Sequence, residues 1–262
     1  MAERGRRRLV NGILVGALIC GITLQVPRSA AQATPARAGG TLTVEFLDDI
    51  SHLDTALCYD NQCYPFAKAM FDRLVDYAGA GDKLVPDAAA AMPAITNGGH
   101  TYTFTLRNDV HFWNGRLATA SDWAYSFERI INPKIQSGAS SFWMNIVGAD
   151  AYASGKAQHA AGIKAPSPFK LEIDLVSPDA SFLNVLAMPF GSVVDKNQIA
   201  KYGRSYDSQH PMGTGPYMFS RHVLGRELVL VKNPHYFLAN AGKVDTIRGE
   251  IGVSTETALL RI

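Results

Sequence analysis

The stretch 101–133 carries two different hydrophobic periods, and this limits the chain to a fold that mixes strands and helices. Apolar side chains occupy every second position of 101–107, a pattern that predicts a half-buried strand. After a turn at Asn114-Gly115, apolar residues recur at helical spacing as far as Asn132-Pro133. Thr119 three residues before Asp122 predicts a capping box at the start of this helix. The chain is therefore expected to be neither all-helical nor all-β.

Further periodic segments support the same α/β class. We predict a buried strand at Thr41–Leu47, an amphipathic helix over 64–77 and a half-buried strand over 169–175. Strands and helices do not alternate strictly, and no period of 20–50 residues marks a repeat protein. The remaining predicted elements are helices at 181–188, 195–202 and after Ser254, and strands at 217–221, 227–232 and 244–253.

The first 33 residues have the composition of an export signal. RGRRR at 4–8 is followed by an uncharged apolar stretch and by Ala31-Gln32-Ala33, a small-residue cleavage pattern. We therefore divide the chain into a signal peptide, 1–33, and a mature part, 34–262, found outside the cytoplasm, in the periplasm or at the cell surface. An uncleaved membrane anchor is the alternative. Lipid attachment at Cys20 is not expected, because Ile19 before it is not small.

The net charge of +2 arises in this leader. Its five arginines and one acid account for the excess, and the remaining residues hold 20 basic and 22 acidic side chains. A nucleic-acid-binding protein would keep a clustered basic face. We therefore expect no nucleic-acid partner.

Cys58 and Cys63 are the two cysteines of the mature part, with four residues between them. In an oxidising compartment they are expected to pair, and so short a loop contributes about 2 kcal/mol by the chain-entropy estimate. Two free thiols are the alternative. A zinc site is disfavoured, because the spacing is wrong and no second pair of ligands follows.

Familiar catalytic patterns do not occur in the sequence. It has neither the G-x-S-x-G of serine hydrolases nor H-E-x-x-H, and its seven histidines are scattered. Gly213-Thr214-Gly215-Pro216 lacks the lysine of a phosphate-binding loop, so we interpret it as a tight turn bordering a cleft. These observations favour a binding protein that is not an enzyme and that uses no metal or cofactor.

Tyr102–Pro133 resembles the signature block of extracellular solute-binding proteins of ABC importers, in the family that binds dipeptides, oligopeptides and nickel complexes. Further matches follow in the same order along nearly all of the mature chain. They are GGTLTV (39–44) with Leu53-Asp54, FDRLVDY (71–77), LVPDAAAAM (84–92), GADAYASGKA (148–157), GIKA (162–165), LEIDLVSPDASFLNVLAMP (171–189), GTGPYMF (213–219) and KNPHYF (232–237).

The resemblance implies a two-lobed clamshell with a type II periplasmic-binding-protein-like fold. The matched segments correspond to its first lobe, a mixed sheet with flanking helices and an extra subdomain. Members are typically about twice as long, so the resemblance implies that the second lobe is largely missing and that the chain is a fragment. A ligand would be captured between the lobes and delivered to a membrane permease with its ATPase subunits, the binding protein working as a monomer.

Candidate ligand contacts follow from the strand ends, the loops and the aromatic segments. Phe46 follows the first strand, Tyr59 and Asn61 lie in the next loop, and the others lie in aromatic or glycine-rich connections. For each aromatic residue, core packing is the alternative. The full set is Phe46, Tyr59, Asn61, Trp113, Trp143, Phe190, Thr214 and Gly215.

The sequence is compatible with several ligands and with more than one function. Dipeptides, longer peptides, metal complexes and sugars all fit the resemblance. A receptor-like module that feeds a signalling partner is one rival function, and a secreted hydrolase is another.

Overall fold

The computed structural model describes residues 39–239 and 241–261. The predicted leader and Cys20 lie outside these residues. The chain divides into units 1–37 and 38–262, and everything below concerns the second. In this part of the chain, no helix is both long enough and apolar enough to span a bilayer.

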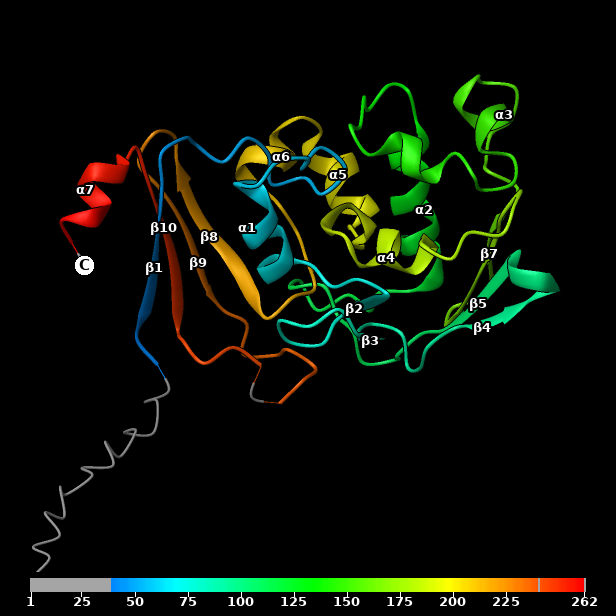
Figure 1. Cartoon of the computed structure of the whole chain (residues 1–262), viewed down its shortest axis with the longest axis horizontal. Coiled ribbons are helices and arrows are strands. Elements are labelled where there is room, and N and C mark those ends of the chain that lie inside the picture. The colour runs from blue at the N-terminus through cyan, green and yellow to red at the C-terminus, as the bar shows by residue number, and fades with distance from the viewer. Residues whose placement is uncertain (1–38, 240, 262) are drawn as a thin grey trace, which may run out of the picture. The chain divides into compact units, whose positions relative to one another are not determined.

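Two four-stranded sheets form the main β-structure, with a small two-stranded sheet, β2-β3, beside them (Figure 1). The first sheet has the order β1-β10-β9-β8, in which only the β1-β10 pair is parallel. The second has the order β4-β5-β7-β6 and is antiparallel throughout. The strands are β1 (Thr41–Phe46), β2 (Val75–Tyr77), β3 (Leu84–Pro86), β4 (Ala94–Thr96), β5 (Thr101–Thr105), β6 (Ile163–Ser167), β7 (Lys170–Asp174), β8 (Tyr217–Val223), β9 (Glu227–Lys232) and β10 (Thr246–Ile251).

Most of the helices lie between the two larger sheets in Figure 1, whereas α7 lies at the outer edge of the first sheet. Helix α1 contacts β8, and α2 packs on β6 and β7. The α-helices are α1 (Cys63–Met70), α2 (Ala120–Ile131), α3 (Ala149–Ala153), α4 (Phe182–Ala187), α5 (Lys196–Tyr202), α6 (Ser205–Gln209) and α7 (Thr255–Leu259). Short 3-10 turns lie at Asn97–Gly99, Ser140–Trp143 and Pro189–Gly191.

The predicted strand and helix of 101–133 are confirmed as β5 and α2. Tyr102 and Phe104 are buried from β5, and Leu171 and Ile173 meet them from β7. At the start of α2, the Thr119 N–H donates to the Asp122 carboxylate at 2.9 Å, as the capping box predicts. The helix ends at Ile131, one residue before Asn132-Pro133, because a residue preceding proline avoids helical geometry.

The predicted helix over 64–77 is wrong in its second half. Helix α1 ends at Met70, and the chain then extends into β2. The reason is a long-range hydrogen bond: the Met70 carbonyl, which a longer helix would pair with Leu74, accepts the Gly215 N–H at 2.9 Å. This bond replaces the next helical one.

Burial of the first strand is also predicted wrongly. Strand β1 is half-buried at best, and Leu42 is 48% exposed. Its only neighbour among the described strands is β10, so it forms an edge of its sheet. Apolar, β-branched composition indicates a strand, but it does not say how many neighbours cover it.

Two apolar clusters stabilise these layers. One is built around α2 and the sheet β4-β5-β7-β6, with Phe104, Trp123 and Phe127 inside it. The other lies between α1 and the sheet β1-β10-β9-β8, with Phe66 and Leu228 inside it. Met212 packs on both, so the segment before Gly213 joins the two cores.

Candidate functional site

Residues 47–62, which we name the anchored loop, connect β1 to α1 without a helix or strand. Three carboxylates, those of Asp49, Asp54 and Asp207, hold it to different elements. Asp54 makes a two-pronged buried ion pair with Arg129 of α2, at 2.9 and 2.6 Å. Asp207 of α6 accepts the N–H groups of Leu53 and Asp54 at 2.8 and 2.7 Å. The loop is therefore fixed by contacts rather than by its own secondary structure.

Histidines add two further contacts to the anchored loop. His52 Nδ1 lies 2.7 Å from Asp207, and Asp49 lies 2.8 Å from His222 Nε2 on β8. Burial raises the pKa of Asp49, but the Gly225 N–H and His222 outweigh it, so that the pKa is lowered overall. At its C-terminal end, a disulfide between Cys58 and Cys63 ties the loop to the first residue of α1.

Tyr59, inside the disulfide ring, belongs to a stack of three aromatic side chains that we name the aromatic shelf. Phe190 is the middle ring and is buried. Tyr59 lies 6.3 Å from it at an interplanar angle of 28°, and Phe142 lies 5.7 Å from it at 11°, measured between ring centroids. The outer rings reach solvent, with Tyr59 51% and Phe142 40% exposed. Two predicted residues, Tyr59 and Phe190, are thus brought together.

Phe142 was missed by the sequence analysis, which selected its neighbour Trp143. Trp143 is fully buried, 4.5 Å from Phe127 between ring centroids, and so presents no surface to a ligand. The 3-10 turn that holds both residues directs one ring inwards and the other outwards. Phe-Trp in sequence indicates two large rings but not which of them faces the core.

A second group of predicted residues meets at the end of α1. The Trp113 N–H donates to the Gly213 carbonyl at 3.1 Å, and its indole N–H donates to the Gly215 carbonyl at 3.4 Å. The Thr214 hydroxyl accepts the Asp72 N–H at 3.1 Å. Trp113 also packs on Phe71, 6.3 Å between ring centroids. These contacts make the junction of Trp113 with Gly213–Gly215 largely a packing site.

Beneath this junction lies a buried cluster of charged groups. Asp72 accepts the Tyr236 hydroxyl at 2.8 Å through one oxygen, and its other oxygen has no protein partner. Burial, reinforced by the Asp87 carboxylate, raises the pKa of Asp72 to about 7. Arg73 pairs with Asp76 at 2.6 Å. The sequence analysis did not identify this cluster: Asp72, Arg73 and Asp76 share the segment FDRLVDY, but Asp87 and Tyr236 come from two others that only the fold brings near.

Phe46 and Asn61 take part in neither group. Phe46 packs on Phe66 of α1, 5.4 Å between ring centroids, and is half-buried. Asn61 is exposed within the disulfide ring, two residues from Tyr59. Of the eight predicted residues, Tyr59 and Asn61 therefore have the most surface open to a ligand.

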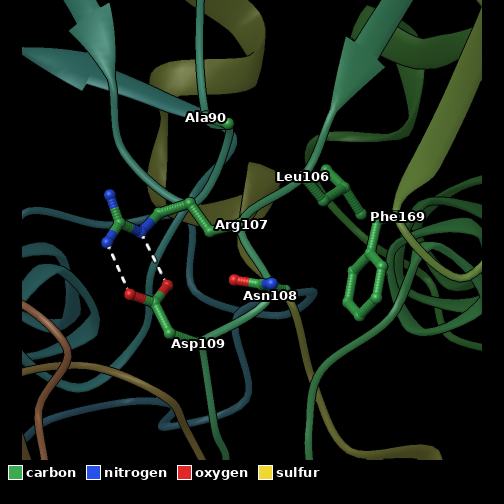
Figure 2. A pocket seen from close by; sticks show the side chains of 6 residues that line it. All are labelled: Ala90, Leu106, Arg107, Asn108, Asp109 and Phe169. Atoms are coloured by element: carbon green, nitrogen blue, oxygen red, sulfur yellow. Dashed lines mark hydrogen bonds and ion pairs between the residues drawn. The ribbon is translucent and has the colours of Figure 1, made fainter.

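Neither of two surface cavities among the described residues includes the aromatic shelf, although Trp113 lines one of them. One of about 410 Å³ is lined by Ala90, Leu106, Asn108 and Phe169 and by an Arg107–Asp109 pair (Figure 2). Arg107 Nε and Nη2 donate to Asp109 at 2.9 and 2.7 Å, so these two charges satisfy each other. Another cavity, of about 310 Å³, has Trp113, Tyr202, Met212 and Phe219 among its lining. Across 39–239 and 241–261, no three acidic, histidine or cysteine side chains converge as metal ligands would.

Comparison with known proteins gives one family. Residues 83–261 match the family model of bacterial extracellular solute-binding proteins, family 5 Middle. The dipeptide-binding protein of Lactococcus lactis is 29% identical over 74% of this chain and 36% of its own length. The probable D,D-dipeptide-binding periplasmic protein DdpA of Escherichia coli is 31% identical over 72% of this chain and 35% of its own length.

Solved structures show the same fold. OppA of Burkholderia pseudomallei superposes with a TM-score of 0.79 at 24% identity, covering 87% of this chain and 44% of OppA. The murein tripeptide-binding protein MppA of Escherichia coli superposes with a TM-score of 0.77 at 26% identity, covering 85% of this chain and 44% of MppA. The chain thus spans less than half the length of these relatives, and what it matches is part of their fold.

Proposed function

Because the chain belongs to family 5 of the bacterial extracellular solute-binding proteins, we propose that it captures peptides or similar small solutes for an ABC importer. The ligand would be held between two lobes, of which residues 34–262 form the first, and passed to a membrane permease and its ATPase subunits. Residues 1–33 would act as the export signal.

One observation carries this proposal: the family match extends over 83–261, most of the described chain. The names of several relatives refer to peptides, among them a dipeptide-binding protein and a di/tripeptide-binding protein. Another relative is named a probable deoxycholate-binding protein, so peptides are the favoured class of ligand and not the only one in the family.

The physical basis of capture would be the burial of a ligand in a closing cleft. Peptide backbone groups can be held by hydrogen bonds worth about 1 kcal/mol each, and apolar side chains gain about 25 cal/mol for each Å² removed from water. Closure follows only if the ligand binds the closed state more tightly than the open one. This chain would supply the surface of the anchored loop and the aromatic shelf to such a cleft.

We further propose that the protein is not an enzyme and works as a monomer. In support, the family consists of substrate-binding proteins. The buried carboxylate of Asp54 is held in a structural ion pair with Arg129.

The test is a binding screen with a chemical readout. The purified chain is titrated, by NMR, with di- and tripeptides and with sugars of similar mass, and the peptides are then analysed by mass spectrometry. We expect saturable shifts with peptides, weaker or absent shifts with sugars, and peptides recovered intact. Binding of sugars alone would overturn peptide capture, and cleaved peptides would show the protein to be an enzyme.

A further inference from the structure

The aromatic shelf holds both of the exposed aromatic rings found in the described residues. Every other phenylalanine, tyrosine and tryptophan at 39–239 and 241–261 is buried or half-buried, whereas Tyr59 and Phe142 are 51% and 40% exposed. They come from segments far apart in the sequence, yet both stack on Phe190. Large apolar side chains that gather at the surface mark interaction sites more often than single exposed ones do.

Tyr59 is held in place before any ligand arrives. The Cys58–Cys63 disulfide closes the ring that contains it, and the Cys58 N–H donates to the Asp54 carbonyl at 3.0 Å. Gly138 also lies against Tyr59: a Cβ atom added there would come to 3.0 Å from the ring. A side chain fixed in this way loses little conformational entropy on binding.

The chemistry of the shelf selects a flat apolar group. The nearest acid in the ring, Asp60, is already engaged by the N–H groups of Gln62 and Cys63, at 2.9 and 2.8 Å, and by the Ser51 hydroxyl. The exposed faces and edges of Tyr59 and Phe142 remain. Aromatic rings prefer offset-stacked or edge-to-face contact with further rings, which an aliphatic side chain cannot match.

We infer that the aromatic shelf is the subsite that receives an aromatic side chain of a bound peptide, and that the Cys58–Cys63 disulfide positions Tyr59 for this contact. The inference rests on the proposed function, since it assumes that peptides bind. It adds the class of peptide preferred and the residues that set the preference. Tyr59 and Phe142 would touch the ligand, and the two cysteines would act through Tyr59.

The experiment compares Ala-Phe-Ala, Ala-Leu-Ala and Ala-Ala-Ala in NMR titrations of the purified, oxidised chain. We expect Ala-Phe-Ala to bind about five- to tenfold more tightly than Ala-Ala-Ala, with Ala-Leu-Ala between them. Tyr59→Ala and Phe142→Ala should each reduce this ratio several-fold. Leu224→Ala, which removes an exposed apolar side chain from the β8–β9 turn, is the matched control and should keep the ratio.

The positioning role of the disulfide is read from the same ratio. Cys58→Ser/Cys63→Ser should lower the ratio of the Ala-Phe-Ala affinity to the Ala-Ala-Ala affinity. Reduction of the unaltered protein gives the same measurement if the double variant does not fold.

The possible outcomes distinguish a failure of peptide capture from a failure of the aromatic shelf as a subsite. If no tripeptide binds, this chain does not capture peptides with its own surface, and the inference falls. If tripeptides bind but Ala-Leu-Ala equals Ala-Phe-Ala, or the ratio survives both alanine variants, the shelf is not the subsite and peptide capture stands. An unchanged ratio after loss of the disulfide overturns only the role of the cysteines.

Discussion

Asp72 is a carboxyl group whose surroundings oppose its charge. It is buried, lies near the carboxylate of Asp87, and keeps one oxygen without a protein partner. An unpaired buried charge is expensive, and a raised pKa means that the folded protein holds a proton there which the unfolded chain releases more readily. The hydrogen bond from Tyr236 compensates only in part.

The contribution of Asp72 to the stability of the folded protein depends on pH. Because the pKa of Asp72 rises from 3.8 to about 7 on folding, its contribution makes the protein less stable as pH increases from about 4 to about 7. Asp72→Asn removes this dependence. We therefore expect the unfolding free energy of the variant, relative to that of the unaltered protein, to be up to about 4 kcal/mol higher at pH 8 than at pH 4. Urea unfolding at the two pH values measures it.

The control for this prediction is Asp109→Asn, which alters an exposed carboxylate paired with Arg107. It should change the stability by less than about 1 kcal/mol at either pH. If Asp72→Asn changed the stability equally at pH 8 and at pH 4, the pKa of Asp72 would not be raised on folding, and the predicted pH dependence would be wrong.

At the scale of elements, Gly213 and Gly215 are the residues that let a loop close on the end of α1. A Cβ atom on Gly213 would lie 1.9 Å from the Met70 carbonyl oxygen, a distance at which the backbone must move. We therefore expect Gly213→Ala to destabilise the protein by about 4 kcal/mol or more. The midpoint of thermal or urea unfolding gives this value.

Gly225, in the turn between β8 and β9, provides the comparison. Unlike Gly213, it has a positive φ, of 68°, but an added Cβ meets nothing within 4 Å. Gly225→Ala should cost about 1 kcal/mol, the usual penalty for a left-handed backbone. A loss at Gly213 no larger than that at Gly225 would show that the approach to the Met70 carbonyl oxygen is relieved at little cost.

The sequence predicts elements well where the information is local. Strand β5 and helix α2 were predicted because their own side chains carry the period and the cap, through Tyr102, Phe104 and Thr119. The end of α1 was not, because Met70 is redirected by Gly215, which no neighbouring residue indicates. In the candidate site, Tyr59 and Phe190 were selected by type, whereas the choice between Phe142 and Trp143 depends on packing that only the fold supplies.

At the scale of the whole molecule, the division into leader and mature chain is a prediction in its own right. Residues 1–33 combine clustered arginines, an apolar stretch and an Ala-x-Ala site. We expect the exported protein to begin at Thr34, because cleavage follows Ala33. N-terminal sequencing of the protein recovered outside the cytoplasm tests this, and an intact N-terminus retained in the membrane fraction would favour the anchor instead.

The parallel pairing of β1 with β10 has a consequence for biosynthesis. Thr41 pairs with Thr246, so β1 finds its partner strand only after residues about 200 positions further along have been translated. Strands β8, β9 and β10 are consecutive in the sequence and can pair as soon as they are made. Strand β1 stays unpaired until then, with Leu42 and Val44 exposed to other nascent chains. Delayed completion of this sheet makes β1 the segment for which a holding chaperone would matter most.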